Sequence, residues 1–354
     1  MLRDILSPRD LLAGYEVVKR SLYSPLESWS SVGFTLNEAT FGLLGASFDP
    51  KRDIRDLSGR VILITGGNTG LGKETVAQLA RHNPSRIYLA ARNETKASAA
   101  IASIQAQLSS TVDIRYLPLD LASFTSIRAA AEKFTSESDR LDLLILNAGT
   151  MANPATTTEE GFEIQFGTNH VGHFLLTKLL LPTLQRTVAA DSAAADNTPS
   201  DVRIVAVASV ASQAAPPLET MTSTEALLAV STWTRYAASK AANIMFASEL
   251  ARRYPDILSV SVHPGVVASE LYETAKSQSA RAEVGIKAAM GLFFRSVRTG
   301  ALTQLYVAGM PRERLTNGAY YIPIGQMSRC NRFVSDVDMA KALWEWTEQE
   351  IAKH

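Results

Sequence analysis

The feature that most constrains the fold is an alternation of short apolar runs with longer segments of helical periodicity between Arg60 and Ile322. Short apolar runs that end in glycine or polar residues predict buried strands, and apolar residues three and four apart predict amphipathic helices. This alternation favours a doubly wound α/β fold, in which helices cover both faces of a parallel sheet. The predicted strands are Arg60–Thr65, Arg86–Ala91, Val112–Leu119, Leu141–Leu146, Val202–Ala208, Leu258–His263 and Ala319–Ile322.

The segments between these strands supply the helices, with two exceptions. Ala189–Ser200 is small and polar, which predicts a flexible surface insertion. The stretch from Ser269 to Thr299 carries scattered apolar side chains between the last two strands. The predicted helices are Lys73–His82, Thr95–Leu108, Thr125–Phe134, Phe162–Leu184 and Tyr236–Arg253.

Composition is that of a globular chain that can bury a large core. Length alone, 354 residues, suggests two or three domains, but α/β folds often exceed about 200 residues as one domain. The chain has 35 basic and 35 acidic residues, so no global field attracts nucleic acid or an anionic membrane. We therefore expect a single domain without a nucleic-acid partner.

Cysteine usage and the N-terminus suit a cytoplasmic protein. The single cysteine, Cys330, excludes an intramolecular disulfide and a cysteine-based zinc site. Asp4 and Pro8 interrupt any apolar region of a signal peptide, and no window approaches the roughly 20 apolar residues that span a bilayer. Leu11–Leu22 has helical spacing, and two alternatives stay open for it. It is either a helix docked on the main domain or a membrane-surface helix or lid.

A glycine-rich loop, T-G-G-N-T-G-L-G at 65–72, joins the first predicted strand to a helix. Glycines let the backbone turn sharply and approach a pyrophosphate, and the helix N-terminus offers free N–H groups to it. A competing pattern, G-x-x-x-x-G-K, ends at Lys73, but Glu74 stands where a triphosphate loop needs Ser or Thr. The loop therefore favours a dinucleotide, with Gly66, Asn68, Gly70, Leu71 and Gly72 as contacts.

The motifs T-G-x-x-x-G-x-G, N-A-G at 147–149 and Y-x-x-x-K at 236–240, in this order, resemble those of classical short-chain dehydrogenases/reductases. The stretch Gln213–Thr234 looks like an added loop, similar to that of retinol-dehydrogenase-like members. The resemblance covers about 57–324 and implies a Rossmann-type sheet. It divides the chain into an N-terminal extension (1–56), a dinucleotide-binding catalytic domain (57–325) with a substrate loop near 268–300, and a C-terminal helical segment (326–354).

The end of the second predicted strand bears on the choice of cofactor. A carboxylate there would hold the ribose hydroxyls of NAD, but this chain has Arg92, whose guanidinium suits the 2′-phosphate of NADP. Lys96 adds charge to the same phosphate or is a solvated helix lysine. The resemblance implies further cofactor contacts. Asp120 and Leu121 would contact the adenine. The other implied contacts are Asn147, Ala148, Gly149, Tyr236, Lys240 and, after the sixth strand, Val267 and Ser269.

Tyr236 and Lys240 lie four residues apart, on one face of a helix that we expect to begin at Tyr236. A lysine ammonium near a phenol stabilises the phenolate and lowers its pKa, so tyrosine becomes an acid/base near neutral pH. The resemblance implies that Ser209 holds the substrate oxygen, with Ser212 as the alternative. It also implies that Asn169 holds a water that relays protons to Lys240.

These features predict an NADP(H)-dependent oxidoreductase that interconverts an alcohol and a ketone or aldehyde. Apolar residues near 269–299 suggest a lipophilic small molecule such as a polyketide, retinoid or steroid-like metabolite, although an ordinary packed helix explains them equally well. His170 and His173 lie three apart, but no third metal ligand is evident and we expect no metal. The alternatives are a dinucleotide-binding regulatory or scaffold protein, and an enzyme of the same fold that epimerises or dehydrates. The resemblance also implies dimers or tetramers, although long extensions can block the usual interfaces.

Overall fold

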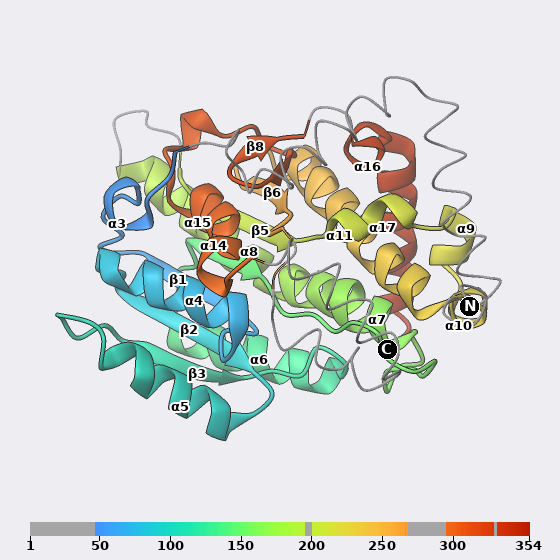
Figure 1. The fold of residues 1–354 in the computed structure, drawn as a ribbon, viewed down its shortest axis with the longest axis horizontal. Helices are drawn as coiled ribbons and strands as arrows, with labels where there is room; N and C mark the ends of the chain where they lie inside the picture. Colours follow the sequence, from blue (N-terminus) through green and yellow to red (C-terminus); the bar gives the residue numbers. More distant parts are fainter. Residues whose placement is uncertain (1–46, 195–199, 266, 268–294, 329–330) are drawn as a thin grey trace, which may run out of the picture.

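The computed structural model describes residues 47–194, 200–265, 267, 295–328 and 331–354. Its centre is an eight-stranded sheet in the order β3-β2-β1-β4-β5-β6-β7-β8 (Figure 1). All neighbours pair in parallel except β7 and β8. The strands are β1 (Val61–Thr65), β2 (Arg86–Ala91), β3 (Ile114–Pro118), β4 (Leu143–Leu146), β5 (Arg203–Val207), β6 (Leu258–Val262), β7 (Tyr320–Ile322) and β8 (Gln326–Met327).

The strands β1 to β7 contribute side chains to two separate cores, one on each face of the sheet, as expected for a doubly wound fold. Ile62 and Ile64 of β1 face one apolar cluster, and Leu63 between them faces the other. Successive side chains of a strand point to opposite faces, so the apolar run predicted for β1 must be covered on both sides. The Rossmann-type α/β fold predicted from the alternation is confirmed. The chain order reverses between β1 and β4, and ligands of such sheets bind at that switch point.

Helices cover both faces. On one face α4, α5 and α15 pack over Ile62 and Ile64, and on the other α6, α8 and α11 pack over Leu63. The principal helices are α4 (Gly70–Leu79), α5 (Glu94–Gln105), α6 (Phe124–Glu137), α8 (Gly172–Ala194), α11 (Thr232–Arg253), α15 (Leu302–Gly309) and α17 (Val337–Ile351). Short helical segments are α3 (Pro50–Asp53), η1 (Ala80–His82), α7 (Ile164–Phe166), η2 (Gly167–Val171), η3 (Val210–Ala214), α9 (Leu218–Met221), α10 (Thr224–Ala229), α14 (Val297–Gly300), η4 (Arg312–Arg314) and α16 (Arg332–Ser335).

The C-terminal helix α17 lies against α8 and α11, as Figure 1 shows for α11. The Trp344 ring stacks on Phe246 of α11 with centroids 5.7 Å apart, and it meets Phe174 of α8 edge-on at 4.7 Å. Lys178 of α8 donates to Glu348 of α17 over 2.6 Å. The apolar faces of α8 and α11 are thus covered by the chain's own C-terminus.

Two sequence predictions need correction. The expected flexible insertion Ala189–Ser200 is wrong for its first part, because α8 continues to Ala194 and Asp191 accepts hydrogen bonds from Arg60 and Arg140. Charged partners from other elements stabilise a helical turn whose composition alone favours a loop. Residues 195–199 lie outside the described chain. The stretch 213–234 is not a plain loop either, since it forms α9, α10 and the start of α11.

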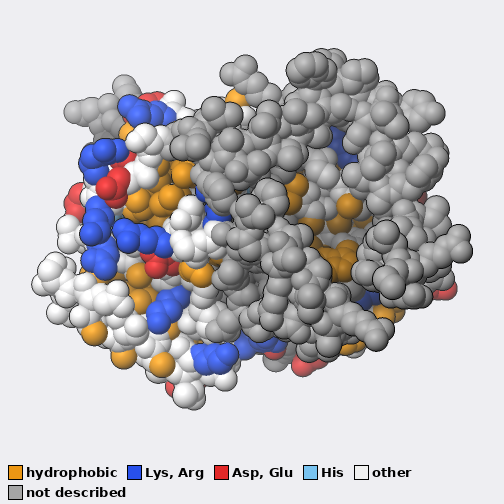
Figure 2. Space-filling view, viewed as in Figure 1, with side chains coloured by type: hydrophobic (Ala, Val, Ile, Leu, Met, Phe, Trp, Pro, Cys, Tyr) orange, Lys and Arg blue, Asp and Glu red, His pale blue; other side chains and the backbone are white. Residues whose placement is uncertain are grey.

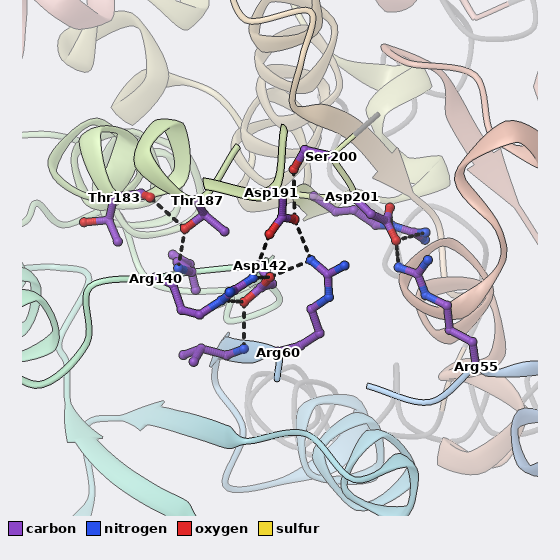
Figure 3. A network of polar contacts seen from close by, with 12 residues as sticks. Arg55, Arg60, Arg140, Asp142, Thr183, Thr187, Asp191, Ser200 and Asp201 are labelled. Atoms are coloured by element: carbon purple, nitrogen blue, oxygen red, sulfur yellow. Dashed lines mark hydrogen bonds and ion pairs between the residues drawn. The ribbon is translucent and has the colours of Figure 1, made fainter. Parts of the chain in front are cut away.

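A polar network lies at the amino ends of the strands, opposite the cavity end of the sheet (Figure 3). Asp142, just before β4, accepts from Arg60 at 2.7 Å, from Arg140 at 2.6 Å and from the Val61 N–H at 2.8 Å. Asp191 of α8 also pairs with both arginines. These contacts fasten the beginnings of β1 and β4 to the end of α8.

Charges of both signs lie together on the described part of the surface. Figure 2 shows Lys and Arg side chains next to Asp and Glu side chains over the region of α3 and α4. This mixture agrees with the formal net charge of zero. Within the described ranges, no helix is long and apolar enough to cross a membrane.

Candidate active site at the carboxyl ends of the strands

A cavity of about 630 Å³ opens at the carboxyl ends of the central strands. Most of the residues singled out in the sequence line it, from the loops after β1 to β6. Asn169 is fully buried next to it, and Ser269 lies outside the described residues, as does most of the expected substrate loop. The predicted residues in the lining are Gly66, Asn68, Gly70, Leu71, Gly72, Arg92, Lys96, Asp120, Leu121, Asn147, Ala148, Gly149, Ser209, Tyr236, Lys240 and Val267.

The glycine-rich loop forms a cradle in which side chains have no room. Gly66 and Gly70 have φ values of 67° and 51°, which favour glycine. A Cβ at Gly72 would lie 2.2 Å from the Gly66 carbonyl oxygen. The free N–H groups at the start of α4 face this space, so the loop fits the pyrophosphate of a dinucleotide. Lys73, the lysine of the competing triphosphate pattern, instead donates to Ser103 of α5 over 3.3 Å.

Thr65 ties this loop to the N-A-G segment, a role that sequence reasoning missed. Its hydroxyl oxygen accepts from the N–H groups of Asn147 at 3.0 Å and Ala148 at 2.9 Å. With both lone pairs engaged, the hydroxyl donates to Nε2 of His173, 2.9 Å away. His173 then carries its proton on Nδ1 and donates to the Asn169 carbonyl over 2.9 Å. The signal for this role was the position of Thr65, directly before Gly66.

The histidines of the N-H-V-G-H stretch are buried and occupy separate environments. His170 contacts Thr347 of α17 at 3.2 Å, whereas His173 contacts Thr65 of β1. Burial lowers the pKa of His173 to about 4 and that of His170 to about 3, so both rings are neutral at pH 7. They pack as neutral hydrogen-bonding groups.

Asn169 sits in a π-helical turn, Gly167–Val171, which interrupts the start of the long helix predicted from Phe162. Its side-chain oxygen accepts from the Thr150 N–H at 2.7 Å, and its amide nitrogen donates to the Thr150 carbonyl and to Ser239, both at 2.9 Å. A Cβ at Gly149 would lie 3.3 Å from the Asn169 oxygen and 3.4 Å from the Lys240 Nζ. Asn169 and Lys240 therefore approach the same side of Gly149.

Tyr236 and Lys240 project from α11 toward the ends of β4 and β5. The sequence predicted a helix that begins at Tyr236. In the structure α11 begins at Thr232, so Tyr236 lies one turn inside the helix. The Lys240 Nζ lies 5.7 Å from the Tyr236 ring centroid and donates to the Val207 carbonyl over 3.0 Å. This spacing lets the ammonium stabilise a phenolate in the cavity wall.

Ser209 follows β5 and caps the N-terminus of the short helix η3. Its hydroxyl oxygen accepts from the Ala211 N–H at 3.2 Å, which leaves the hydroxyl proton for another acceptor. Ser209 and Tyr236 line the same cavity, whereas Ser212, the alternative, is fully buried. The geometry favours Ser209 as the hydroxyl that can meet a substrate.

Burial lowers the pKa of the Lys240 ammonium from 10.5 to about 8. A base with a lowered folded-state pKa binds fewer protons folded than unfolded between these values, so its contribution to stability rises with pH there. We expect the ligand-free protein to gain about 2 kcal/mol from this group between pH 7.5 and 9.5. Urea unfolding at both pH values measures the gain. Lys240→Met should lack it, and an equal gain in that variant would contradict the burial of a charged lysine.

Comparisons with known proteins show the family of this chain. Residues 60–221 match the family model of short chain dehydrogenases. A short-chain dehydrogenase/reductase of Armillaria gallica is 34% identical over 88% of this chain and 97% of its own length. The chain belongs to the short-chain dehydrogenase/reductase family. It is an oxidoreductase of the kind that binds a nicotinamide dinucleotide and acts on the CH–OH group of small molecules.

Other relatives refine the placement within the family. Retinol dehydrogenase 12 of Mus musculus is 34% identical over 81% of this chain and 85% of its own length. A solved structure from Mycobacterium paratuberculosis is 30% identical, with a TM-score of 0.60, over 85% of this chain and 96% of that one. The predicted resemblance to the family and its retinol-dehydrogenase-like branch is confirmed.

Proposed function

We propose that this oxidoreductase uses NADP(H) to interconvert an alcohol and a ketone or aldehyde on a lipophilic small molecule. The observation that carries the proposal is that Ser209, Tyr236 and Lys240 line one cavity with the glycine-rich loop. A module that only binds a dinucleotide needs no such acid/base group. The name of the relative retinol dehydrogenase 12 supports a lipophilic substrate.

Preference for NADP is supported by the charge at the end of β2. Arg92 is exposed at the rim of the cavity, and Lys96 follows in the first turn of α5. Asn93 caps α5 by accepting from the Lys96 N–H at 2.8 Å, so the helix start is held beside Arg92. A guanidinium and an ammonium at this place suit a 2′-phosphate.

The residues act as follows in the reductive direction. A nicotinamide bound in the cavity would supply the hydride for the carbonyl carbon. Ser209 and Tyr236 donate hydrogen bonds to the carbonyl oxygen and stabilise the negative charge that develops on it. Tyr236 gives its proton to that oxygen, and the nearby Lys240 stabilises the phenolate that remains. Lys240 would also hold the nicotinamide ribose, and a water held at Asn169 would return the proton from solvent to Tyr236 by way of Lys240.

The proposal is tested by titrating the protein's fluorescence with NADPH and with NADH, and then adding a panel of lipophilic ketones and aldehydes. We expect tighter NADPH binding, and oxidation of the cofactor by at least one member of the panel. Preference for NADH would overturn the assignment of Arg92. Tight binding without turnover across the panel would favour a regulatory dinucleotide-binding protein.

Arg92→Ala measures the contribution of the guanidinium to cofactor choice. Loss of a charge-assisted contact to phosphate costs about 1.5–3 kcal/mol, so NADPH affinity should fall about tenfold to a hundredfold. NADH has no 2′-phosphate, and its affinity should change little. An equal loss for both cofactors would show that Arg92 does not read the phosphate.

A further inference from the structure

A buried ion pair lies directly beside Tyr236. The Arg235 Nε is 3.0 Å from Oε1 of Glu163, and the two side chains are 5% and 0% exposed. The Arg235 Nε and the Glu163 Oε1 make no hydrogen bond within the described residues, so the pair is held by its opposite charges and by the hydrogen bonds of its other atoms. Glu163 is held because its other oxygen caps α7, accepting from Gln165 at 3.0 Å and Phe166 at 2.8 Å.

Arg235 also donates to the backbone of two segments, one of which lines the cavity. Its Nη2 donates to the Asn153 carbonyl over 2.7 Å, and its Nη1 donates to the Val230 carbonyl over 3.0 Å. The hydroxyl of Thr232, in the first turn of α11, donates to the same Asn153 carbonyl over 3.0 Å. The residues 150–153, which follow the N-A-G segment, are thereby joined to the start of α11.

Gln165 makes a second bridge between the same two segments. Its oxygen accepts from the Ala152 N–H at 3.0 Å, and its nitrogen donates to the Thr232 carbonyl at 3.0 Å. Ala152 has a φ of 59°, a conformation that a residue with a Cβ adopts only where its surroundings enforce it. Met151 and Ala152 pack against the Tyr236 side chain in a small buried cluster.

We propose that Arg235 and Glu163 are positioning residues for Tyr236. The pair, with Gln165, locks 150–153 against the first turn of α11, and the locked segment holds the Tyr236 side chain at the cavity. The catalytic consequence rests on the proposed function, since it assumes that Tyr236 transfers the proton. The mechanical coupling does not depend on any substrate.

Hydrogen exchange tests the coupling without a substrate. In Arg235→Met/Glu163→Gln, which leaves no unpaired charge, we expect the amides of 150–153 to exchange about tenfold faster than in the wild type. Arg235→Met alone should have a larger effect, because it leaves the Glu163 carboxylate buried without its cation. Unchanged exchange at 150–153 in the double variant would overturn the proposal.

A control on the same helix is provided by a less buried ion pair, in which Glu249 also pairs with Arg253. Arg252 lies 2.9 Å from Glu249 near the end of α11, away from the cavity. Arg252→Met should leave exchange at 150–153 and the kinetic constants unchanged. This variant separates a general weakening of α11 from a local effect at Tyr236.

Kinetics test the consequence for catalysis. With a substrate from the carbonyl panel, the double variant should lose about tenfold in kcat, because small misplacements of reacting groups are costly. The dissociation constant of NADPH should stay within about twofold, since the glycine-rich loop is untouched. An unchanged kcat with faster exchange would contradict the positioning role. Absence of turnover in the wild type would count against the proposed function, and exchange alone would then decide the coupling.

Discussion

Tyr236→Phe is expected to lower kcat by about a hundredfold to ten-thousandfold while NADPH still binds. The phenol is the group that can give a proton to the substrate oxygen, and phenylalanine keeps the ring but removes the hydroxyl. Tyr236 is only 7% exposed and its ring packs against Met151 and Ala152, so the isosteric ring should leave the fold intact. Single-turnover oxidation of NADPH, with a fluorescence titration of the cofactor, measures both properties.

Two controls sharpen this experiment. Ser212→Ala removes a hydroxyl that is fully buried and should leave kcat unchanged, whereas Ser209→Ala should lower it. Full activity of Tyr236→Phe would refute the assignment of the acid/base group. Loss of NADPH binding in that variant would instead show that the phenol holds the cofactor.

Asp142→Ala should lower the free energy of unfolding by about 2–4 kcal/mol, because a buried carboxylate that accepts from two arginines and from a buried backbone N–H is lost. The Asp142 side chain is 2% exposed and accepts from Arg60, from Arg140 and from the Val61 N–H (Figure 3). Without it, both guanidinium groups share the Asp191 carboxylate, and a buried N–H of β1 loses its partner. Urea unfolding at pH 7 measures the change.

Asp113→Ala is the matched control for Asp142→Ala. Asp113 also pairs with two arginines, Arg86 at 2.7 Å and Arg115 at 3.0 Å, but its side chain is 38% exposed. Exposed pairs contribute about 0–1 kcal/mol, so this variant should unfold almost as the wild type does. If Asp113→Ala and Asp142→Ala lowered the free energy of unfolding equally, burial would not determine how much each network stabilises the fold.

The apolar runs predicted the strands well, because a strand that is buried on both faces needs apolar side chains at consecutive positions. The second predicted strand, Arg86–Ala91, matches β2 at both ends. The end of α8 was missed for the opposite reason. The composition of Ala189–Ser200 favours a loop. In the structure Asp191 accepts hydrogen bonds from Arg60 and Arg140, which are 131 and 51 positions away in the sequence. Such contacts have no local signature.

The candidate site shows the same division. Gly66, Gly72, Tyr236 and Lys240 were singled out in the sequence because the roles proposed for them require fixed residue types at fixed spacing along the chain, and the structure places all four in the lining of one cavity. Glu163 and Arg235 were not found, since their pairing joins residues that are far apart in the sequence. The sequence marked His173 only as one of two histidines three residues apart. The structure shows that it connects the Thr65 hydroxyl to the Asn169 carbonyl.

The sequence by itself determined the Rossmann-type sheet, the cradle for a pyrophosphate and the tyrosine–lysine pair, because each depends on periodicity or spacing within a single element or turn. Tertiary structure alone decided which residues brace that pair. It buried Asp142 between two arginines, aligned Thr65 with His173 and Asn169, and placed Arg235 against Glu163. The physical reason is that the strength of a polar contact depends on burial and on partners from other elements, and only the folded chain brings those together.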